Sequence, residues 1–382
     1  MIKRQIESKI KELVSRYPVV SVTGPRQSGK TTLLKSIFPD YRYVSLENKD
    51  IREFAIADPN KFLKTYAAPV ILDEVQRAPD LFSYIQTIVD ASNLPGQYVL
   101  SGSQNFLLLA SIGQSLAGRV GIFKLLPFSI RELKSADRLP TLDEILYQGL
   151  YPPIYDKQIP AVSWYSDYVE TYLQRDVQLI KSITNMRSFR KFLTLCAVRS
   201  GQVVNAASLG RDCGVSSPTI QEWLSILEAS YILFFLQPYT TNLSSRVIKS
   251  PKLYFYDPGL LSFLLGIHSV NEMVISQSRG AVFETLMVSE YVKAAFNQKE
   301  PFQGHFLRDR DGHEVDFVYD VAGIPTLTEM KATQTISDKF FDGIRYFQSR
   351  TKTPYRSQVI YGGDTSQSRS AGEIVSWREA VG

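Results

Sequence analysis

Cysteine and histidine are scarce in this chain, and their scarcity excludes some kinds of site. The 382 residues include 2 cysteines, Cys196 and Cys213, and 3 histidines, His268, His305 and His313. The cysteines form no C-x-x-C pair, and donors this few and this widely spaced do not make a zinc site. The cysteine content is typical of a reducing compartment, so we expect a cytoplasmic location.

Long apolar runs are also missing. The most apolar stretches, 231–236 and 260–267, are far shorter than the ~20 residues that a helix needs to span a bilayer. Near the start of the chain, charged residues alternate with Ile2, Ile6 and Ile10. That spacing predicts an amphipathic helix rather than a secretory signal, and no membrane partner is expected.

Charge of one sign is not concentrated in any segment. The net charge is +5, and the 43 lysines and arginines are scattered rather than gathered in a tail. This balance permits nucleic-acid binding without arguing for it. Hydrophobic residues make up 44% of the chain, which is enough for sizeable cores, and the length predicts two or three domains.

The stretch GPRQSGKTT at residues 24–32 fits the phosphate-binding pattern G-x-x-x-x-G-K-[ST]. It follows an apolar run that predicts a strand, and it precedes apolar residues at helical spacing. This order directs the first amides of the helix at phosphate groups. We expect Lys30 to neutralise the β and γ oxygens of a nucleotide and Thr31 to place its hydroxyl on Mg²⁺. The predicted nucleotide-binding residues are Gly24, Pro25, Arg26, Gln27, Ser28, Gly29, Lys30, Thr31, Thr32 and Asp73.

The run APVILDE at residues 68–74 is an apolar strand that ends in two carboxylates, a Walker B motif. Ligands of parallel sheets bind at the carboxyl ends of strands, which is where these acids would lie. We expect Asp73 to hold Mg²⁺ through water and Glu74 to orient and polarise the attacking water, so that Lys30 and Glu74 are catalytic. A strand that ends in acids by chance is the alternative, and the phosphate loop upstream argues against it.

Several motifs together carry a family resemblance. Besides GPRQSGKTT, they are ILDEVQ at 71–76, SGS at 101–103, SLAGR at 115–119, LPFS at 126–129 and GLYPP at 149–153. The chain resembles the AAA-type P-loop ATPases of bacteria and archaea that carry a C-terminal DUF4143 domain. The resemblance spans nearly the whole chain and implies ATP binding and a core of five parallel strands in the order 5-1-4-3-2. It does not imply a biological process.

Two further catalytic residues are suggested by likeness to additional-strand ATPases. A predicted strand over 97–105 ends in small polar residues, at the position where such enzymes sense the γ-phosphate; we favour Ser103, followed by Gln104. Arg119 lies just before the predicted strand 121–126 and resembles an arginine finger. A finger usually acts across a subunit boundary, which would require a homo-oligomer. The alternative for Arg119 is a cation that stabilises a helix C-terminus.

We predict three domains: an ATPase domain over 1–150, a helical linker with a winged helix over 151–275, and a nuclease-like domain over 276–382. Helical spacing recurs in 164–176 and 188–200, where Arg175 and Asp176 form either structural ion pairs or a lid over the nucleotide. Residues 205–227 predict a helix, a glycine-containing turn and a second helix. Strands over 231–239 and 251–257 would add the wing.

A winged helix can read DNA through its second helix, where Thr219, Gln221 and Glu222 are expected to face outward. No lysine or arginine occurs between Ser216 and Tyr231, which disfavours direct base readout. A packing or dimerisation module is an equal alternative. Basic residues near the wing keep phosphate contact open. They are Arg246, Lys249 and Lys252.

Residues 276–382 predict the order helix, three strands, helix, strand, which resembles the PD-(D/E)xK nuclease fold. Glu284 lies on the first helix and Asp316 on the second strand. Glu329 and Lys331 lie two apart on the third strand, so both side chains project from one face. The three acids are candidate ligands of a divalent metal, and Lys331 would position or activate water. A charged sheet face without metal is the alternative.

Three carboxylates with only Lys331 as counter-charge would repel one another unless a cation lies among them. We therefore expect a weak Mg²⁺ or Mn²⁺ site there, independent of the phosphate loop. Nuclease activity is a separate step beyond metal binding.

The predicted fold class is α/β, with a parallel-sheet AAA-type ATPase core, a winged helix-turn-helix and an α/β nuclease-like domain. The predicted function is Mg²⁺-dependent ATP binding and hydrolysis coupled to a module that acts on nucleic acid such as DNA. One alternative is a nucleotide-dependent switch that binds protein partners and has an inactive nuclease-like domain. Another is an ATP-independent DNA-binding module whose phosphate loop is structural.

Overall fold

The computed structural model describes residues 2–92, 94–103, 115–172, 183, 185–239, 250–350 and 354–381. The chain forms two compact units. The first comprises Met1–Phe128 with the short segments Ala229–Tyr231 and Ala295–Glu300, and the second comprises the remainder. The middle and C-terminal regions, which the sequence predicts as separate domains, thus share one unit.

A five-stranded parallel sheet forms the centre of the first unit, in the order β2-β3-β4-β1-β5. Read from the other edge, this is the order 5-1-4-3-2 that the family resemblance implies, and that prediction is confirmed. The strands are β1 (Val19–Thr23), β2 (Arg42–Ser45), β3 (Val70–Asp73), β4 (Tyr98–Gly102) and β5 (Val120–Lys124).

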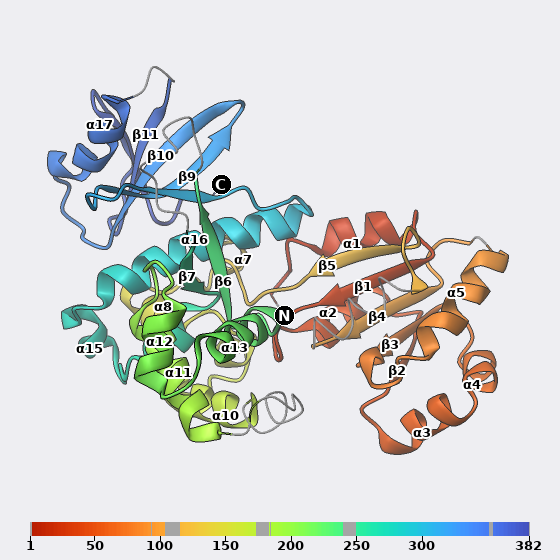
Figure 1. Ribbon diagram of the computed structural model, residues 1–382. Helices are drawn as coiled ribbons and strands as arrows, with labels where there is room; N and C mark the ends of the chain where they lie inside the picture. The colour runs from red at the N-terminus through yellow and green to blue at the C-terminus, as the bar shows by residue number, and fades with distance from the viewer. Residues whose placement is uncertain are drawn as a thin grey trace. The chain divides into compact units, whose positions relative to one another are not determined.

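Helices cover both faces of this sheet (Figure 1) because successive strand residues point to opposite sides. Val20 and Val22 pack with α1 and α2 in one core, whereas Val19 lies in a second core with α3, α4 and α5. The strands are therefore apolar on both sides. The helices are α1 (Glu7–Val14), α2 (Lys30–Ile37), α3 (Lys49–Ala57), α4 (Pro59–Thr65), the 3-10 turn η1 (Val75–Arg77) and α5 (Leu81–Ser92).

An eight-stranded mixed sheet runs through the second unit in the order β12-β13-β11-β10-β9-β8-β6-β7. The antiparallel pair of β6 and β7 joins this sheet through a parallel pairing of β6 with β8. The strands are β6 (Leu233–Pro238), β7 (Lys252–Phe255), β8 (His305–Arg308), β9 (Glu314–Val321), β10 (Ile324–Lys331), β11 (Arg356–Tyr361), β12 (Gln367–Arg369) and β13 (Gly372–Ser376).

The C-terminal elements follow the predicted order of helix, three strands, helix and strand. Helix α16 (Arg279–Gln298) precedes β8, β9 and β10, and the 3-10 turn η3 (Asp338–Phe341) with α17 (Asp342–Gln348) precedes β11. The last helix is held by a core that includes Ile344 and Phe347 against strand residues such as Val359. Strands β12 and β13 extend the sheet beyond the prediction.

The rest of the second unit is mainly helical. Its helices are α7 (Ile130–Ser135), α8 (Leu142–Gln148), α9 (Pro152–Asp156), α10 (Ala161–Tyr172), α11 (Met186–Val198), α12 (Ala206–Cys213), α13 (Ser217–Ala229), α14 (Pro258–Leu264) and α15 (Val270–Ile275). The predicted helix, turn and helix correspond to α12 and α13, and β6 and β7 follow them as predicted. Arg175, Asp176, Arg246 and Lys249 lie outside the described residues.

The α/β fold class with a parallel-sheet ATPase core is confirmed. None of the helices in the described ranges combines the length and the apolarity that a membrane span requires.

Candidate functional site

The phosphate loop connects the end of β1 to the start of α2 and depends on two glycines. At Gly24 the φ angle is +150°, and a Cβ atom there would lie 2.1 Å from the carbonyl oxygen of Leu125. Gly29, directly before α2, adopts φ +93° in the left-handed region. Because side chains are disfavoured at both positions, the backbone can approach a ligand closely.

Lys30 is the first residue of α2, and its side chain is only 6% exposed. Its ammonium group donates to the carbonyl oxygens of Gly24 at 3.0 Å and Pro25 at 2.7 Å. The charge predicted for phosphate binding is therefore inside the loop and bonded to it. A nucleotide would have to compete with these two backbone carbonyls for the ammonium.

The other predicted loop residues differ in exposure. Ser28 is fully buried, whereas Gln27 and Thr32 are exposed, and Pro25 and Arg26 are buried and half-buried. Thr31 is half-buried at the first turn of α2. Few side chains of the loop are thus exposed to a ligand. Most contacts with a bound nucleotide would therefore come from backbone groups.

Asp73 is the last residue of β3 and is held by three hydroxyl groups. Thr31 Oγ1 donates to its Oδ2 at 2.9 Å, and the Tyr43 hydroxyl donates to the same oxygen at 2.7 Å. Ser101 on β4 donates to Oδ1. Burial raises the pKa of Tyr43, and the bond to Asp73 raises it further, so Tyr43 stays a donor. The carboxylate is thereby fixed beside the first turn of α2.

Glu74 follows β3 in a left-handed backbone conformation, with φ 54°. Such a conformation is costly for a residue other than glycine and is found at functional sites more often than elsewhere. The Ser103 hydroxyl lies 3.2 Å from each of its carboxylate oxygens, and Gln76 donates to it as well. The predicted water-orienting acid and the predicted phosphate sensor are therefore in contact.

Arg119 is not part of this group. It immediately precedes β5, whose first residue pairs with Val19 at the start of β1, whereas the phosphate loop follows the end of β1. Arg119 donates to both carboxylate oxygens of Asp90 near the end of α5. The structure therefore separates Arg119 from the phosphate loop of its own chain, and a role in a neighbouring subunit stays a prediction. Gln104 lies outside the described residues.

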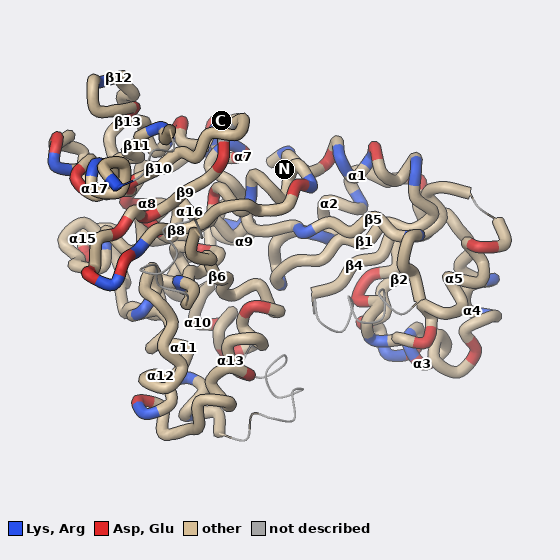
Figure 2. The backbone as a smooth tube through the Cα atoms, turned by 45° about the horizontal axis from the view of Figure 1, so that its top comes forward, with Lys and Arg blue, Asp and Glu red and all other residues tan. Residues whose placement is uncertain are grey.

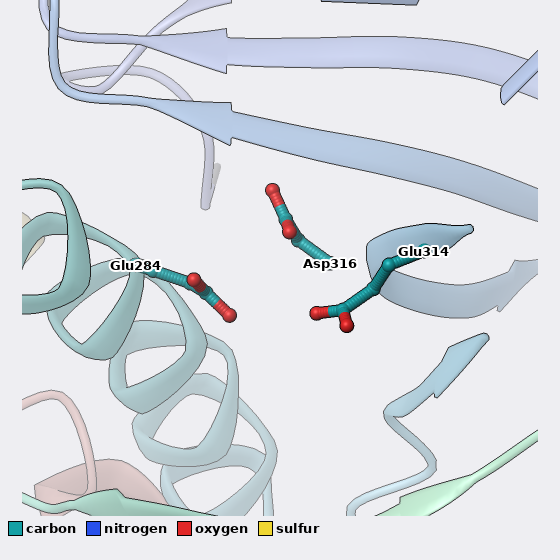
Figure 3. A group of neighbouring side chains, drawn as sticks. All are labelled: Glu284, Glu314 and Asp316. Carbon is teal, nitrogen blue, oxygen red and sulfur yellow. The ribbon is translucent and has the colours of Figure 1, made fainter. Parts of the chain in front are cut away.

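A second group of acids lies in the C-terminal part of the chain. Glu284 on α16 faces Glu314 and Asp316 on β9 (Figure 3), and a carboxylate oxygen from each lies within 4.8 Å of the others. Glu314 takes the place in this trio that the sequence assigns to Glu329. The sequence could have indicated Glu314, because it precedes Asp316 by two residues and so lies on the same face of the strand.

Lys252 lies among these acids, and sequence reasoning did not assign it there. It begins β7, is 0% exposed, and its ammonium group lies 3.1 Å from Glu284 Oε1 and in contact with Glu314. The Tyr254 hydroxyl donates to Glu284 as well. Lys331 is thus not the only counter-charge, which corrects that premise of the metal prediction.

Glu329 and Lys331 lie together beside Asp316, as their spacing predicts. The Lys331 ammonium is 2.6 Å from Glu329 Oε2 and 3.6 Å from Asp316 Oδ2. Burial and the neighbouring Asp316 raise the pKa of Glu329 to about 9. Burial also acts on Asp316, but Lys331, Lys252 and the Met330 N–H outweigh it and lower the pKa of that acid. Asp316 is therefore the charged member of this pair.

The helix-turn-helix presents a neutral to acidic surface. On α13 the residues Gln221, Glu222, Ser225 and Glu228 are exposed, and Thr219 is half-buried. The acidic positions on α13 are visible in Figure 2. Within α13 no basic residue accompanies them. This surface is poorly suited to a phosphate backbone, whose binding relies on lysine and arginine.

The first unit and its site define the class of the protein. A parallel sheet in the order 5-1-4-3-2, a glycine-dependent phosphate loop after β1, and an acid pair at the end of β3 are the features of an AAA-type P-loop ATPase. Comparison with family models agrees, since residues 16–134 match the AAA domain and residues 279–379 match the domain of unknown function DUF4143. Residues 16–134 are therefore similar to the AAA domain, and residues 279–379 are similar to DUF4143. Residues 139–271 match a further domain of unknown function, DUF8612.

Two relatives come from mycobacteria. The uncharacterized protein Rv2008c of Mycobacterium tuberculosis is 28% identical over 338 residues, which cover 88% of this chain and 75% of the relative. The uncharacterized protein Mb2031c of Mycobacterium bovis gives the same values.

Solved structures show more distant likeness. The Walker-type ATPase PABY2304 of Pyrococcus abyssi is 14% identical with a TM-score of 0.47, covering 69% of this chain and 96% of that one. AMPPCP-bound DnaA from Aquifex aeolicus is 16% identical with a TM-score of 0.30, covering 58% of this chain and 85% of that one.

Proposed function

We propose that this chain binds Mg²⁺-ATP at the phosphate loop and hydrolyses it. The observation that carries the proposal is the hydrogen bond of 2.9 Å between Thr31 and Asp73. It brings a hydroxyl and a carboxylate together beside the loop, and hard oxygen donors of this kind suit Mg²⁺. The hydrogen bonds from the half-buried Tyr43 and the buried Ser101 fit a carboxylate that must keep one orientation.

Each residue then has a separate task. Lys30 would leave the carbonyls of Gly24 and Pro25 and neutralise the β and γ oxygens of ATP. Thr31 and Asp73 would hold the magnesium ion, directly and through water. When bound, the ion would spread the charge that develops on the transferred phosphoryl group. Glu74 would orient the attacking water, and Ser103 would contact the γ-phosphate.

Calorimetric titration of the full chain with ATP, with and without Mg²⁺, tests the binding half of this proposal. We expect ATP binding that requires Lys30 and that strengthens with Mg²⁺. Phosphate release in the same buffer tests hydrolysis. Binding that is indifferent to Lys30 would mean that the loop is structural.

A second candidate function concerns nucleic acid. It is supported by the C-terminal element order and by the neighbouring Asp316, Glu329 and Lys331, which resemble the PD-(D/E)xK arrangement. Salt-dependent DNA binding would support this function, because each phosphate contact releases counterions.

The rival is a nucleotide-dependent switch that binds protein partners through an inactive nuclease-like scaffold. Two observations favour the rival over DNA: the exposed face of α13 is neutral to acidic, and Lys252 is buried among the acids. DNA binding whose affinity falls steeply with salt would argue for the nucleic-acid function. No DNA binding even at low salt would argue for the switch.

A further inference from the structure

Each member of the acid trio already has a cation from its own chain. Lys252 lies 3.1 Å from Glu284, the Arg308 Nη1 atom lies 2.9 Å from Glu314, and the Lys331 ammonium lies 3.6 Å from Asp316. Three cations therefore face the three carboxylates of the trio, and Lys331 is shared with Glu329, from which it lies 2.6 Å away. The repulsion that would call for an added metal ion is compensated within the fold.

Lys252 is the innermost of the three cations. Its side chain is 0% exposed, whereas those of Arg308 and Lys331 are 36% and 35% exposed. Its ammonium contacts both Glu284 and Glu314 and lies 3.3 Å from the Tyr254 hydroxyl. A group that contacts two acids of the trio at once fills the space that a bridging ion would need.

The backbone holds Lys252 in this place. It pairs with Leu236 in the β6–β7 ladder and forms an isolated bridge with Val203 on its other side. The next residue, Leu253, bonds through its carbonyl to the Gly201 N–H at 2.7 Å and through its N–H to Gln202 at 3.1 Å. Because the backbone of β7 is paired on both sides, the main chain at Lys252 is fixed beside the acids.

We propose that Lys252 takes the place of the divalent cation in this cluster, so that the natural chain binds no divalent ion there. The nuclease-like fold implies a metal site, and the residues present do not fit one while Lys252 is in place. The weak metal site expected from the sequence is replaced by an internal ammonium. This conclusion is independent of the phosphate loop and of ATP hydrolysis.

The direct test replaces Lys252 by methionine, which has a similar length and no charge. In nucleotide-free full-length Lys252→Met, buried carboxylates lose their cation, and we expect the melting temperature to fall by about 5–10 °C. Mn²⁺ should recover most of this loss, because it binds the folded cluster and stabilises it by mass action. The melting temperature of the wild-type chain should change by less than about 1 °C with the same Mn²⁺.

A matched control is available in the same unit. Lys293 forms a buried pair with Glu290 at 2.8 Å, with side chains 1% and 2% exposed. Lys293→Met should also lower the melting temperature, but Mn²⁺ should not restore it. Equal recovery in both variants would mean that Mn²⁺ acts elsewhere, for example at Asp73, and would overturn the proposal.

A second test does not need Lys252→Met, in case that variant does not fold. Free Mn²⁺ can be followed by electron paramagnetic resonance during titration of nucleotide-free wild type and Asp316→Asn. Equal binding curves support an internal ammonium in place of the metal. Tighter Mn²⁺ binding by wild type than by Asp316→Asn would overturn it, as would a folded Lys252→Met chain that shows no response to Mn²⁺.

Discussion

Thr31 and Asp73 are 42 residues apart in sequence and are joined by a hydrogen bond of 2.9 Å from the threonine hydroxyl to the carboxylate. The bond links the first turn of α2 to the end of β3. It therefore connects the segment that would bind phosphate to the segment that would bind magnesium. Two hydroxyls from the neighbouring strands, those of Tyr43 and Ser101, also donate to this acid.

The first prediction concerns Tyr43, which bonds to Asp73 and would affect magnesium binding only through that acid. Tyr43→Phe removes one hydrogen bond of 2.7 Å while keeping the ring. We expect the Mg²⁺ concentration needed for half-maximal ATP hydrolysis to rise about tenfold, as is typical when a group behind a metal ligand is lost. ATP binding without Mg²⁺ should be unchanged.

Tyr41→Phe is the control for this variant. Its hydroxyl bonds to the Gly96 carbonyl at 2.8 Å, away from Asp73, so the Mg²⁺ dependence should stay at the wild-type value. If Tyr43→Phe behaves like Tyr41→Phe, the hydroxyl does not position Asp73.

The second prediction is that Lys30→Ala loses ATP binding while the chain stays folded. The lysine is buried, but its ammonium group donates to carbonyl oxygens of Gly24 and Pro25, which lie in the loop and not in an apolar core. Calorimetric titration measures the loss of ATP binding, and circular dichroism shows whether the chain stays folded. A variant that still binds ATP with wild-type affinity contradicts the role of the ammonium.

The third prediction concerns Arg119. Arg119 pairs with Asp90 and lies next to the start of β1, whereas the phosphate loop follows the end of that strand. Arg119→Ala should therefore leave ATP binding by its own chain unchanged. If it acts on a neighbouring subunit, mixing Arg119→Ala with Lys30→Ala chains should recover part of the lost turnover. Turnover that is proportional to protein concentration and untouched by Arg119→Ala would assign the arginine to a structural pair.

The fourth prediction concerns the second unit. The buried Asp257 accepts hydrogen bonds from the Tyr165 hydroxyl at 2.5 Å and from the N–H groups of Leu150 and Leu260 at 2.8 Å each. Asparagine offers one acceptor oxygen, so Asp257→Asn leaves a buried donor without a partner. We expect a loss of about 2 kcal/mol in the free energy of unfolding, measured by urea denaturation.

Asp156→Asn is the comparison for that variant. Asp156 is exposed and lies 3.9 Å from Arg138, so its loss should change the free energy of unfolding by less than about 1 kcal/mol. Similar losses in the two variants would contradict the structural role given to Asp257.

The sequence predicted those site residues that belong to local sequence patterns. Thr31, Asp73 and Glu74 follow from a loop pattern and from acids after an apolar strand. The order of the five strands came from the family resemblance, because no local pattern reveals which strands are neighbours. Tyr43 belongs to the part that was not predicted, since a tyrosine in a strand gives no sign of which acid it will meet.

Lys252 is the clearest omission at the C-terminal acids. A lysine within the apolar run 252–256 was a usable signal, because a charged residue in a buried strand needs a partner. The sequence places it near a wing and so suggested phosphate contact, whereas the fold pairs it with Glu284 on a helix 32 residues further along. That pairing depends on the sheet joining β6 to β8, which no local pattern contains.

Glu74→Gln tests the central claim most directly. Its amide keeps the shape of the side chain but cannot accept a proton from the attacking water. Calorimetry should give an affinity for Mg²⁺-ATP close to that of wild type, while phosphate release should be slower by about 100-fold or more. Equal phosphate release by Glu74→Gln and wild type, or wild-type chains that bind Mg²⁺-ATP and release no phosphate, would contradict the claim that this site hydrolyses ATP.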